Sequence, residues 1–141
     1  MLVKLKKLHK DAQIPTYGTE YSACVDLYAI EDYIFRPGDL KFVRSGLAVE
    51  IPPGYYIKMY NRSGNAAKRQ LVIVSSKVID ADYRGEIFAP LKNIGDVDQN
   101  IRKGDRFAQM MVKKVIRMEF EETDELSVTK RGAGGFGHTG K

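Results

Sequence analysis

Five short stretches of polar and glycine residues interrupt a chain that is otherwise rich in β-favouring residues. In chain order they are Ala23 to Leu27, Arg62 to Gly64, Val78 to Gly85, Gly104 to Gln109 and Arg131 to Lys141. Carboxylates suit Mg²⁺, guanidinium groups neutralise phosphate charge, and the closely spaced backbone N–H groups of glycine-rich segments bind phosphate oxygens. Together these stretches carry the groups that hydrolysis of a phosphoanhydride in water requires.

The charged residues of these stretches suit different parts of such a reaction. A single aspartate such as Asp26 is sufficient for Mg²⁺, because this ion keeps several waters and takes further ligands from substrate phosphates. Asp80 and Asp82 lie two residues apart, and one of them can act as a base while the other is structural. Arg62 can neutralise phosphate charge, and Tyr83 offers a flat apolar face to a sugar. Each stretch taken alone also fits an ordinary turn or a turn-capping aspartate.

The last stretch, RGAGGFGHTGK, is rich in glycine and has few side chains with which to build a core. Glycine loses more conformational entropy on ordering than any other residue, so we expect this tail to be flexible until a ligand orders it. Arg131, Phe136, His138 and Thr139 offer it a guanidinium group, an aromatic face, an imidazole and a hydroxyl. These groups suit a nucleotide, and a loose terminus without a function is the alternative.

The elements that must position these stretches have the pattern of strands. Turn signals at Arg36–Asp39 and Pro52–Gly54 separate short β-favouring segments. The expected strands are Leu40–Val43, Leu47–Ile51, Tyr55–Tyr60, Leu71–Val74, Ile87–Leu91 and Phe107–Ile116. One short helix is expected over Gly64–Arg69, with Ser63 as its N-cap. The pattern predicts an all-β domain, either a sandwich or a jelly roll.

The composition is that of one ordinary globular domain. The chain has 141 residues, of which 43% are hydrophobic and 29% charged, which suffices for a single core. A net charge of +5 favours an anionic partner, either a nucleotide triphosphate or a nucleic acid. Cys24 is the single cysteine, and neither histidine lies at metal-ligand spacing, so we expect no disulfide and no structural zinc. The amino terminus has no signal-peptide or membrane-span pattern, which predicts an intracellular, cytoplasmic protein.

The chain divides into three segments. Residues 1–117 form the expected β-rich core, 118–130 an acidic segment, and 131–141 a lid over the nucleotide. The acidic segment fits a solvated strand or linker. Alternatively, the part around Phe120 crosses to a neighbouring subunit as an added strand and carries the tail with it.

The order of the five stretches resembles the trimeric deoxyuridine triphosphate nucleotidohydrolases, the dUTPase family. The sequences VIDADYRG and RGAGGFGHTG carry the most specific part of this resemblance, which covers nearly the whole chain. It implies a homotrimer of jelly-roll subunits of the dUTPase (β-clip) type, with three sites between the chains. In each site, one chain supplies the first, second and fourth motifs, another the third, and the last its tail.

The resemblance also implies an activity. An enzyme of this family hydrolyses dUTP to dUMP and pyrophosphate by attack of water on the α-phosphorus, which supplies dUMP for thymidylate synthesis and keeps uracil out of DNA. Asp26 would hold Mg²⁺ through its waters, and Asp80 would activate the attacking water. The triphosphate would be bound by Arg62, Ser63 and Gly64.

Further residues would bind the rest of the substrate. Tyr83 would pack under the deoxyribose where a 2′-hydroxyl would clash, and Gln109 would contact the phosphate and water network. Backbone groups of the hairpin that leads through Val78 to Asp80 would recognise the edge of uracil. The tail residues that would bind substrate are Arg131, Phe136, Gly137, His138 and Thr139. Phe136 would stack on the uracil ring, and the polar groups would close over the γ-phosphate.

Five positions depart from the usual pattern of the family. Cys24 stands where glycine is usual, Asn61 where proline is usual, and Asn65 where an apolar residue is usual. We expect these three to affect packing rather than chemistry. Lys77 replaces a glycine in the hairpin expected to recognise uracil, so it bears on base selectivity, and His138 replaces a serine that would contact the γ-phosphate.

Three other functions are alternatives. A dCTP deaminase of related fold, or a combined deaminase–dUTPase, needs a glutamate as general acid and base, and Glu86, next to Gly85, is the glutamate available to the clusters. A binding protein could use nucleotide occupancy as a signal to a partner. A nucleic-acid binder fits least well, because the basic residues are scattered and the aromatic residues form no recognised motif. We therefore expect neither a stable nucleic-acid partner nor a membrane partner.

Overall fold

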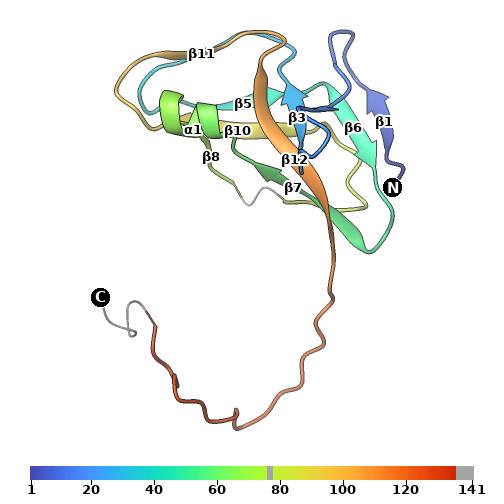
Figure 1. Ribbon diagram of the computed structural model, residues 1–141, viewed down its shortest axis with the longest axis vertical. Coiled ribbons are helices and arrows are strands. Elements are labelled where there is room, and N and C mark those ends of the chain that lie inside the picture. The colour runs from blue at the N-terminus through green and yellow to red at the C-terminus, as the bar shows by residue number, and fades with distance from the viewer. Residues whose placement is uncertain (76–77, 136–141) are drawn as a thin grey trace.

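The computed structural model describes residues 1–75 and 78–135, and within them nearly all regular structure is β-strand (Figure 1). The strands are β1 (Lys4–Lys7), β2 (Thr16–Tyr17), β3 (Val25–Tyr28), β4 (Tyr33–Phe35), β5 (Leu40–Arg44), β6 (Leu47–Glu50), β7 (Tyr55–Tyr60), β8 (Leu71–Ile73), β9 (Val78–Ile79), β10 (Phe88–Asn93), β11 (Gln99–Ile101) and β12 (Arg106–Lys114). One helix, α1 (Ser63–Arg69), follows β7. The all-β class with one short helix is thus confirmed.

The strands form antiparallel sheets, of which the largest has the order β2-β3-β12-β7-β9. A second sheet has the order β5-β10-β8, and two pairs, β1-β6 and β11-β4, complete the described topology. Strand β12 lies at the centre of the large sheet, where Gln109 is opposite Asp26 of β3 and Tyr60 of β7. Segments distant in the sequence are therefore neighbours in space, as the first and fourth polar stretches are here.

A β-bulge in β12 changes which face of the sheet its first residues occupy. Arg106 is opposite Tyr28, but Ala108 is opposite the next residue, Leu27, so Phe107 is the extra residue. Side chains three positions apart in a regular strand point to opposite faces. The extra residue brings Arg106 to the same face as Gln109, and bulges of this kind redirect side chains beside functional sites.

The core lies between the sheets and consists of the inward side chains of alternating strand positions. The largest fully buried apolar side chains are Phe35, Phe107, Leu27, Leu47, Ile57, Leu71, Ile87, Leu91, Ile101 and Val43. Buried polar groups are also paired, as where the Asn93 Nδ2 group donates to the carbonyl oxygens of Phe35 and Val97. Among the described residues no buried side-chain nitrogen or oxygen lacks a hydrogen-bond partner, as close packing requires.

Helix α1 begins one residue earlier than the sequence pattern predicts. Ser63 is its first helical residue, and the N-cap is Arg62, which has extended backbone and no capping side-chain hydrogen bond. The prediction of Ser63 as N-cap is therefore wrong. The helix ends at Arg69, and its C-cap, Gln70, has the left-handed φ of 52° and an N–H that donates to the Asn65 carbonyl oxygen.

Most of the expected strands are present, with shifted ends. Tyr55–Tyr60 is found as predicted, whereas the strand expected over 87–91 covers 88–93 and that expected over 107–116 covers 106–114. Six short strands were not predicted, since each is only two to four residues long: β1, β2, β3, β4, β9 and β11. A period-two pattern cannot be recognised over so few residues.

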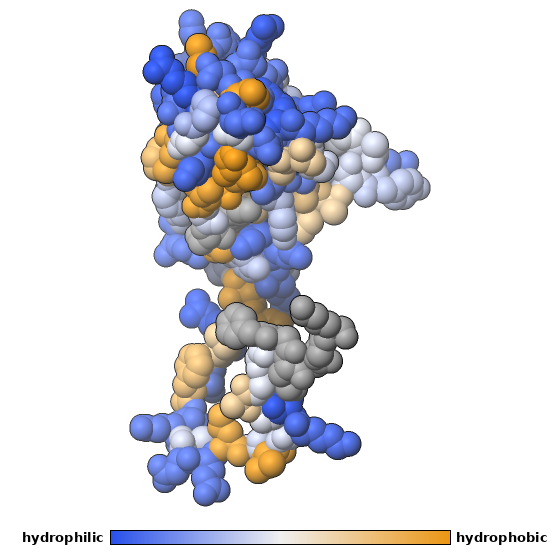
Figure 2. All heavy atoms as spheres, turned by 90° about the vertical axis from the view of Figure 1, so that its left-hand side faces the viewer, coloured by the Kyte–Doolittle hydropathy of each residue, from blue (hydrophilic) through white to orange (hydrophobic). Residues whose placement is uncertain are grey.

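After β12 the chain leaves the sheets as a long extended arm (Figure 1). Apolar and polar residues are mixed along it (Figure 2), and Phe120, Leu126 and Val128 are 86–99% exposed. Side chains of this kind are not left in water without a cost in free energy, so the arm is suited to lie against another surface. The described helix is too short and too polar to span a membrane.

Candidate active site

Asp26 is held between two arginines on one face of the large sheet. Its Oδ1 accepts a hydrogen bond from Arg62 Nε at 2.8 Å, and its Oδ2 accepts one from Arg106 Nη1 at 3.3 Å. The Asp26 side chain is only 10% exposed, against 27% for Arg62 and 48% for Arg106. One carboxylate between two guanidinium groups leaves a net positive charge and further N–H donors for an anion.

The first, second and fourth polar stretches meet around this cluster. They line a pocket of about 450 Å³ together with Gly18 and Ser22, the other lining residues being Ala23, Cys24, Asp26, Arg62, Ser63, Gly64, Arg106 and Gln109. Arg106 was missed as a candidate site residue. Its position in the fourth polar stretch could have marked Arg106 as a candidate. Regular strand periodicity, however, places Arg106 on the face opposite to Gln109.

Two asparagines at departures from the usual pattern hold this pocket together. The Asn61 Oδ1 atom accepts a hydrogen bond from the Ile73 N–H at 2.7 Å, and the Asn61 carbonyl oxygen accepts one from Gln109 Nε2 at 2.9 Å. Asn65 is 5% exposed, and its Nδ2 group donates to the carbonyl oxygens of Arg106 and Phe107, both at 3.2 Å. These contacts fasten α1 and the turn before it to β12 and β8, consistent with the expected role in packing.

The third polar stretch forms a different pocket. Asp80 follows β9 and lines a pocket of about 340 Å³ with Val78, Tyr83, Phe88 and others. The Asp80 carbonyl oxygen accepts a hydrogen bond from the Tyr83 N–H at 3.2 Å, which closes a turn. This pocket combines a carboxylate with an apolar lining.

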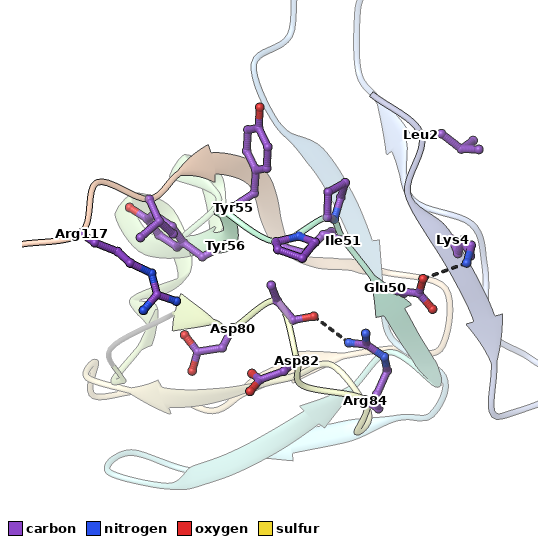
Figure 3. A pocket seen from close by; sticks show the side chains of 15 residues that line it. Leu2, Lys4, Glu50, Ile51, Tyr55, Tyr56, Asp80, Asp82, Arg84 and Arg117 are labelled. Carbon is purple, nitrogen blue, oxygen red and sulfur yellow. Dashed lines mark hydrogen bonds and ion pairs between the residues drawn. The ribbon is translucent and has the colours of Figure 1, made fainter.

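Asp80 also lines a second, larger pocket of about 820 Å³ (Figure 3). Asp82 and Arg84 lie in the same wall, and Arg117 reaches it from the base of the arm. Arg84 Nη1 donates to the Ala81 carbonyl oxygen at 2.7 Å, which fixes the turn that carries the two aspartates.

The pocket around Asp26 and the pocket beside Asp80 do not meet within one chain. Strands β3 and β9 are three strand steps apart in the large sheet, which is about 14 Å at the usual strand spacing. Gln109 is opposite Asp26 and Tyr60, whereas Ile57 is opposite Ile79, which adds roughly 10 Å along the strands. The described part of the chain therefore places Asp26 and Asp80 too far apart to act on one atom.

The tail begins with a turn that follows the extended arm. Arg131 Nε donates to the Gly134 carbonyl oxygen at 2.8 Å, and Gly132 has the left-handed φ of 50°. Arg131 lines none of the pockets described above. The candidate residues Phe136, Gly137, His138 and Thr139 lie outside the described residues, as does Lys77.

The sequence model of the dUTPase family matches residues 10–140. The chain belongs to the dUTPase family. A deoxyuridine 5'-triphosphate nucleotidohydrolase of Nautilia profundicola is 45% identical over the whole of both chains, and one of Helicobacter pylori strain J99 is 41% identical, over 99% of this chain and 97% of that relative. The dUTPase of Staphylococcus bacteriophage 80alpha, solved with dUpNHpp, is 27% identical and aligns with a TM-score of 0.92 over 99% of each chain.

Two groups near the dUTPase motifs are unsuited to further chemistry. Burial is the main cause that raises the pKa of the Cys24 thiol, with a smaller opposing effect of Lys113, so the thiol stays protonated and is a poor nucleophile. The Glu86 carboxylate accepts three hydrogen bonds from Arg44 and one from the Gly46 N–H. A carboxylate engaged in this way is not free to shuttle protons, which argues against the deaminase alternative.

Proposed function

We propose that this chain is a dUTP diphosphatase that hydrolyses dUTP to dUMP and pyrophosphate, with water attacking the α-phosphorus. The observation that carries the proposal is the division of the catalytic groups between two separate pockets in a member of the dUTPase family. The pocket around Asp26, Arg62 and Arg106 has the chemistry for a triphosphate, and the pocket beside Asp80 and Tyr83 has that for a water and a nucleoside. Three copies of the chain would bring the two kinds of pocket together.

In the phosphate pocket, Arg62 and Arg106 neutralise the charge that builds on the phosphate oxygens during attack. Ser63, Gly64 and Gln109 supply hydrogen-bonding groups around them. These residues keep the pyrophosphate leaving group oriented in line with the attacking water.

The donor set fits a magnesium ion that arrives with the substrate rather than a resident one. The described residues contain no group of three histidine, cysteine, aspartate or glutamate side chains able to hold a metal. Asp26 offers one carboxylate already bound to two arginines, which suits contact through water, because Mg²⁺ keeps several waters and binds substrate phosphates. When bound, the ion supplies additional neutralisation of the triphosphate charge.

In the second pocket, Asp80 accepts the proton of the attacking water. Tyr83 packs under the deoxyribose and excludes a 2′-hydroxyl, and the backbone at Val78 recognises the uracil edge. The apolar lining from Met59, Phe88 and Pro90 excludes water from the base. The reaction then proceeds where only the catalytic water has access.

We further propose that residues 118–130 form an arm that lies along β1 of a neighbouring subunit. Strand β1 has β6 as its partner within the described residues, so its other edge is available for a strand. It carries Lys4, Lys6 and Lys7, while the arm carries Glu119, Glu121, Glu122, Asp124 and Glu125. Lysines on an edge strand disfavour pairing with a like-charged strand and favour an acidic one. The arm would carry residues 131–141 to the site as a lid.

Pyrophosphate release should be measured with dUTP, UTP, dCTP and dTTP, with and without Mg²⁺. We expect turnover of dUTP, stimulation by Mg²⁺ and poor turnover of the other three.

Asp80→Asn should lower kcat by about 10³-fold through loss of the base, with an unchanged thermal unfolding curve. Asp82→Asn, two residues away on the same turn, is the matched control. Full turnover by Asp80→Asn would refute the role of Asp80, and ammonia release from dCTP would favour the deaminase.

Removal of residues 131–141 tests the lid separately. Ordering a glycine-rich segment costs entropy, which contacts with the triphosphate offset. The shortened chain should assemble as the full chain does, as measured by light scattering, and should lose most of its dUTP turnover. Retention of activity would contradict the lid.

A further inference from the structure

The segment 80–87 joins the two sheets and carries both Asp80 and Tyr83. It begins after β9, at the edge of the large sheet, and ends at β10, in the centre of the second sheet. Glu86 is the residue at which this segment is fastened to β5. Arg44 Nε donates to both Glu86 carboxylate oxygens, at 3.2 and 3.1 Å, and Arg44 Nη2 donates to Oε2 at 3.0 Å. The Gly46 N–H adds a bond to Oε1 at 2.8 Å.

The partner of Glu86 is itself held at its backbone. The Arg44 N–H donates to the Tyr33 hydroxyl at 3.0 Å, and that hydroxyl donates to Glu31 Oε1 at 2.6 Å. Burial, together with the bond to Glu31, raises the pKa of Tyr33 to about 12, so the hydroxyl remains protonated. Next to Glu86, the Ile87 N–H donates to the Leu47 carbonyl oxygen at 2.7 Å. The end of the segment is therefore fixed by both main-chain and side-chain bonds.

Tyr83 depends on this fixed end for the position of its ring. Its hydroxyl donates to the Glu86 carbonyl oxygen at 3.1 Å. The ring lies so close to Gly85 that a Cβ atom built there would overlap the Tyr83 hydroxyl and ring carbons. Glycine at position 85 and the anchored carbonyl group of Glu86 thus define one place for the ring.

We propose that Arg44 and Glu86 act as a positioning clamp for Tyr83, and that this clamp sets the preference for deoxyribose over ribose. The inference rests on the proposed function, in which Tyr83 packs under the sugar. A ribose differs from a deoxyribose at the 2′ position by a single oxygen atom. The Tyr83 ring can therefore exclude the 2′-hydroxyl only if the ring is fixed in place. Arg44 suits this role because its planar fork binds both carboxylate oxygens at once.

The test is the kinetics of Arg44→Met with dUTP and with UTP. Loss of the charge-assisted bonds should raise KM for dUTP roughly tenfold, while kcat changes less than about threefold, because Asp80 and the phosphate pocket are intact. The ratio of kcat/KM for dUTP to that for UTP should fall by at least about tenfold, as the loosened ring admits the 2′-hydroxyl. Arg44→Lys, which keeps the charge but not the fork, should restore part of this ratio.

Lys41→Met is the matched control. Lys41 lies on the same strand and forms an exposed ion pair with Asp39 at 3.7 Å, so its loss should leave the ratio unchanged. An unchanged ratio in folded Arg44→Met would overturn the proposal, as would an equal fall in the control.

Hydrogen exchange separates the clamp from the proposed function. The amides of residues 83–85 should exchange faster in Arg44→Met and in the milder Glu86→Gln, but not in Lys41→Met. If the wild-type chain failed to hydrolyse dUTP, the proposed function would be wrong. The exchange rates would still show whether Arg44 and Glu86 hold this segment in place. Unchanged exchange in Glu86→Gln would count against the clamp even if Arg44→Met failed to fold.

Discussion

The pairing of Asp26 with two arginines predicts a defined loss of stability when its charge is removed. Asp26→Asn keeps the shape of the side chain and one carbonyl oxygen, but leaves Arg62 and Arg106 without their carboxylate. Because Asp26 is nearly buried and bonded at 2.8 Å to Arg62, the two guanidinium groups then repel each other in a partly desolvated pocket.

The size of the effect follows from the exposure of each partner. A hydrogen bond between charged groups in a part-buried setting is worth about 1.5–3 kcal/mol. The bond to Arg106 is longer, at 3.3 Å, and that side chain is 48% exposed, so solvent screening reduces its contribution to roughly 0.5 kcal/mol. Because asparagine retains one acceptor, we expect Asp26→Asn to lower the free energy of unfolding by about 2 kcal/mol.

Urea unfolding of both proteins at one fixed subunit concentration measures this difference, since assembly makes stability depend on concentration. The matched control is Glu50→Gln, which breaks the exposed pair of Glu50 with Lys4 at 2.8 Å and should have little effect on stability, because solvent screens this pair. A double-mutant cycle with Arg62→Met isolates the pairwise energy. A loss for Asp26→Asn no larger than that of the control would refute the reasoning.

Three further predictions concern packing and pH. Asn65→Ala removes a buried hydrogen bond to the Phe107 carbonyl oxygen and one of the two side-chain donors to the Arg106 carbonyl oxygen, and it should cost about 2 kcal/mol in urea unfolding; an effect below that of an exposed substitution would contradict this. The hydrogen bond from Lys103 is the main cause that lowers the pKa of Asp11. The pair therefore stabilises the fold above the ordinary aspartate pKa, and this stabilisation is lost as pH falls through the lowered pKa. The Tm difference between wild type and Lys103→Met should therefore be present at about pH 7 and vanish near about pH 2, and a difference that persists in acid would be evidence against the pair. Gly46 has a φ of +68° and is closely surrounded, so Gly46→Ala should lower the Tm by several degrees in calorimetry, a loss of more than about 1 kcal/mol, and an unchanged Tm would show that the backbone can relax there.

The sequence by itself determined the family, the all-β class and the identity of the groups suited to phosphate chemistry. These conclusions depend on local information, namely residue types, their spacing and their order along the chain. Asp26, Arg62 and Asp80 could be singled out because carboxylates and guanidinium groups have the same chemistry wherever they lie. The strand at Tyr55–Tyr60 could be predicted because its pattern is long enough to read.

Only the tertiary structure decided which of these groups meet. The bulge at Phe107 turns Arg106 to the face of Asp26, and no local pattern marks a bulge. The strand order decided that Asp26 and Asp80 lie in different pockets of one chain, and the pairing of β5 with β10 decided that Glu86 is bound by Arg44. The physical reason is that register and strand order are set by hydrogen bonds between segments far apart in the sequence, whose energies depend on the whole fold.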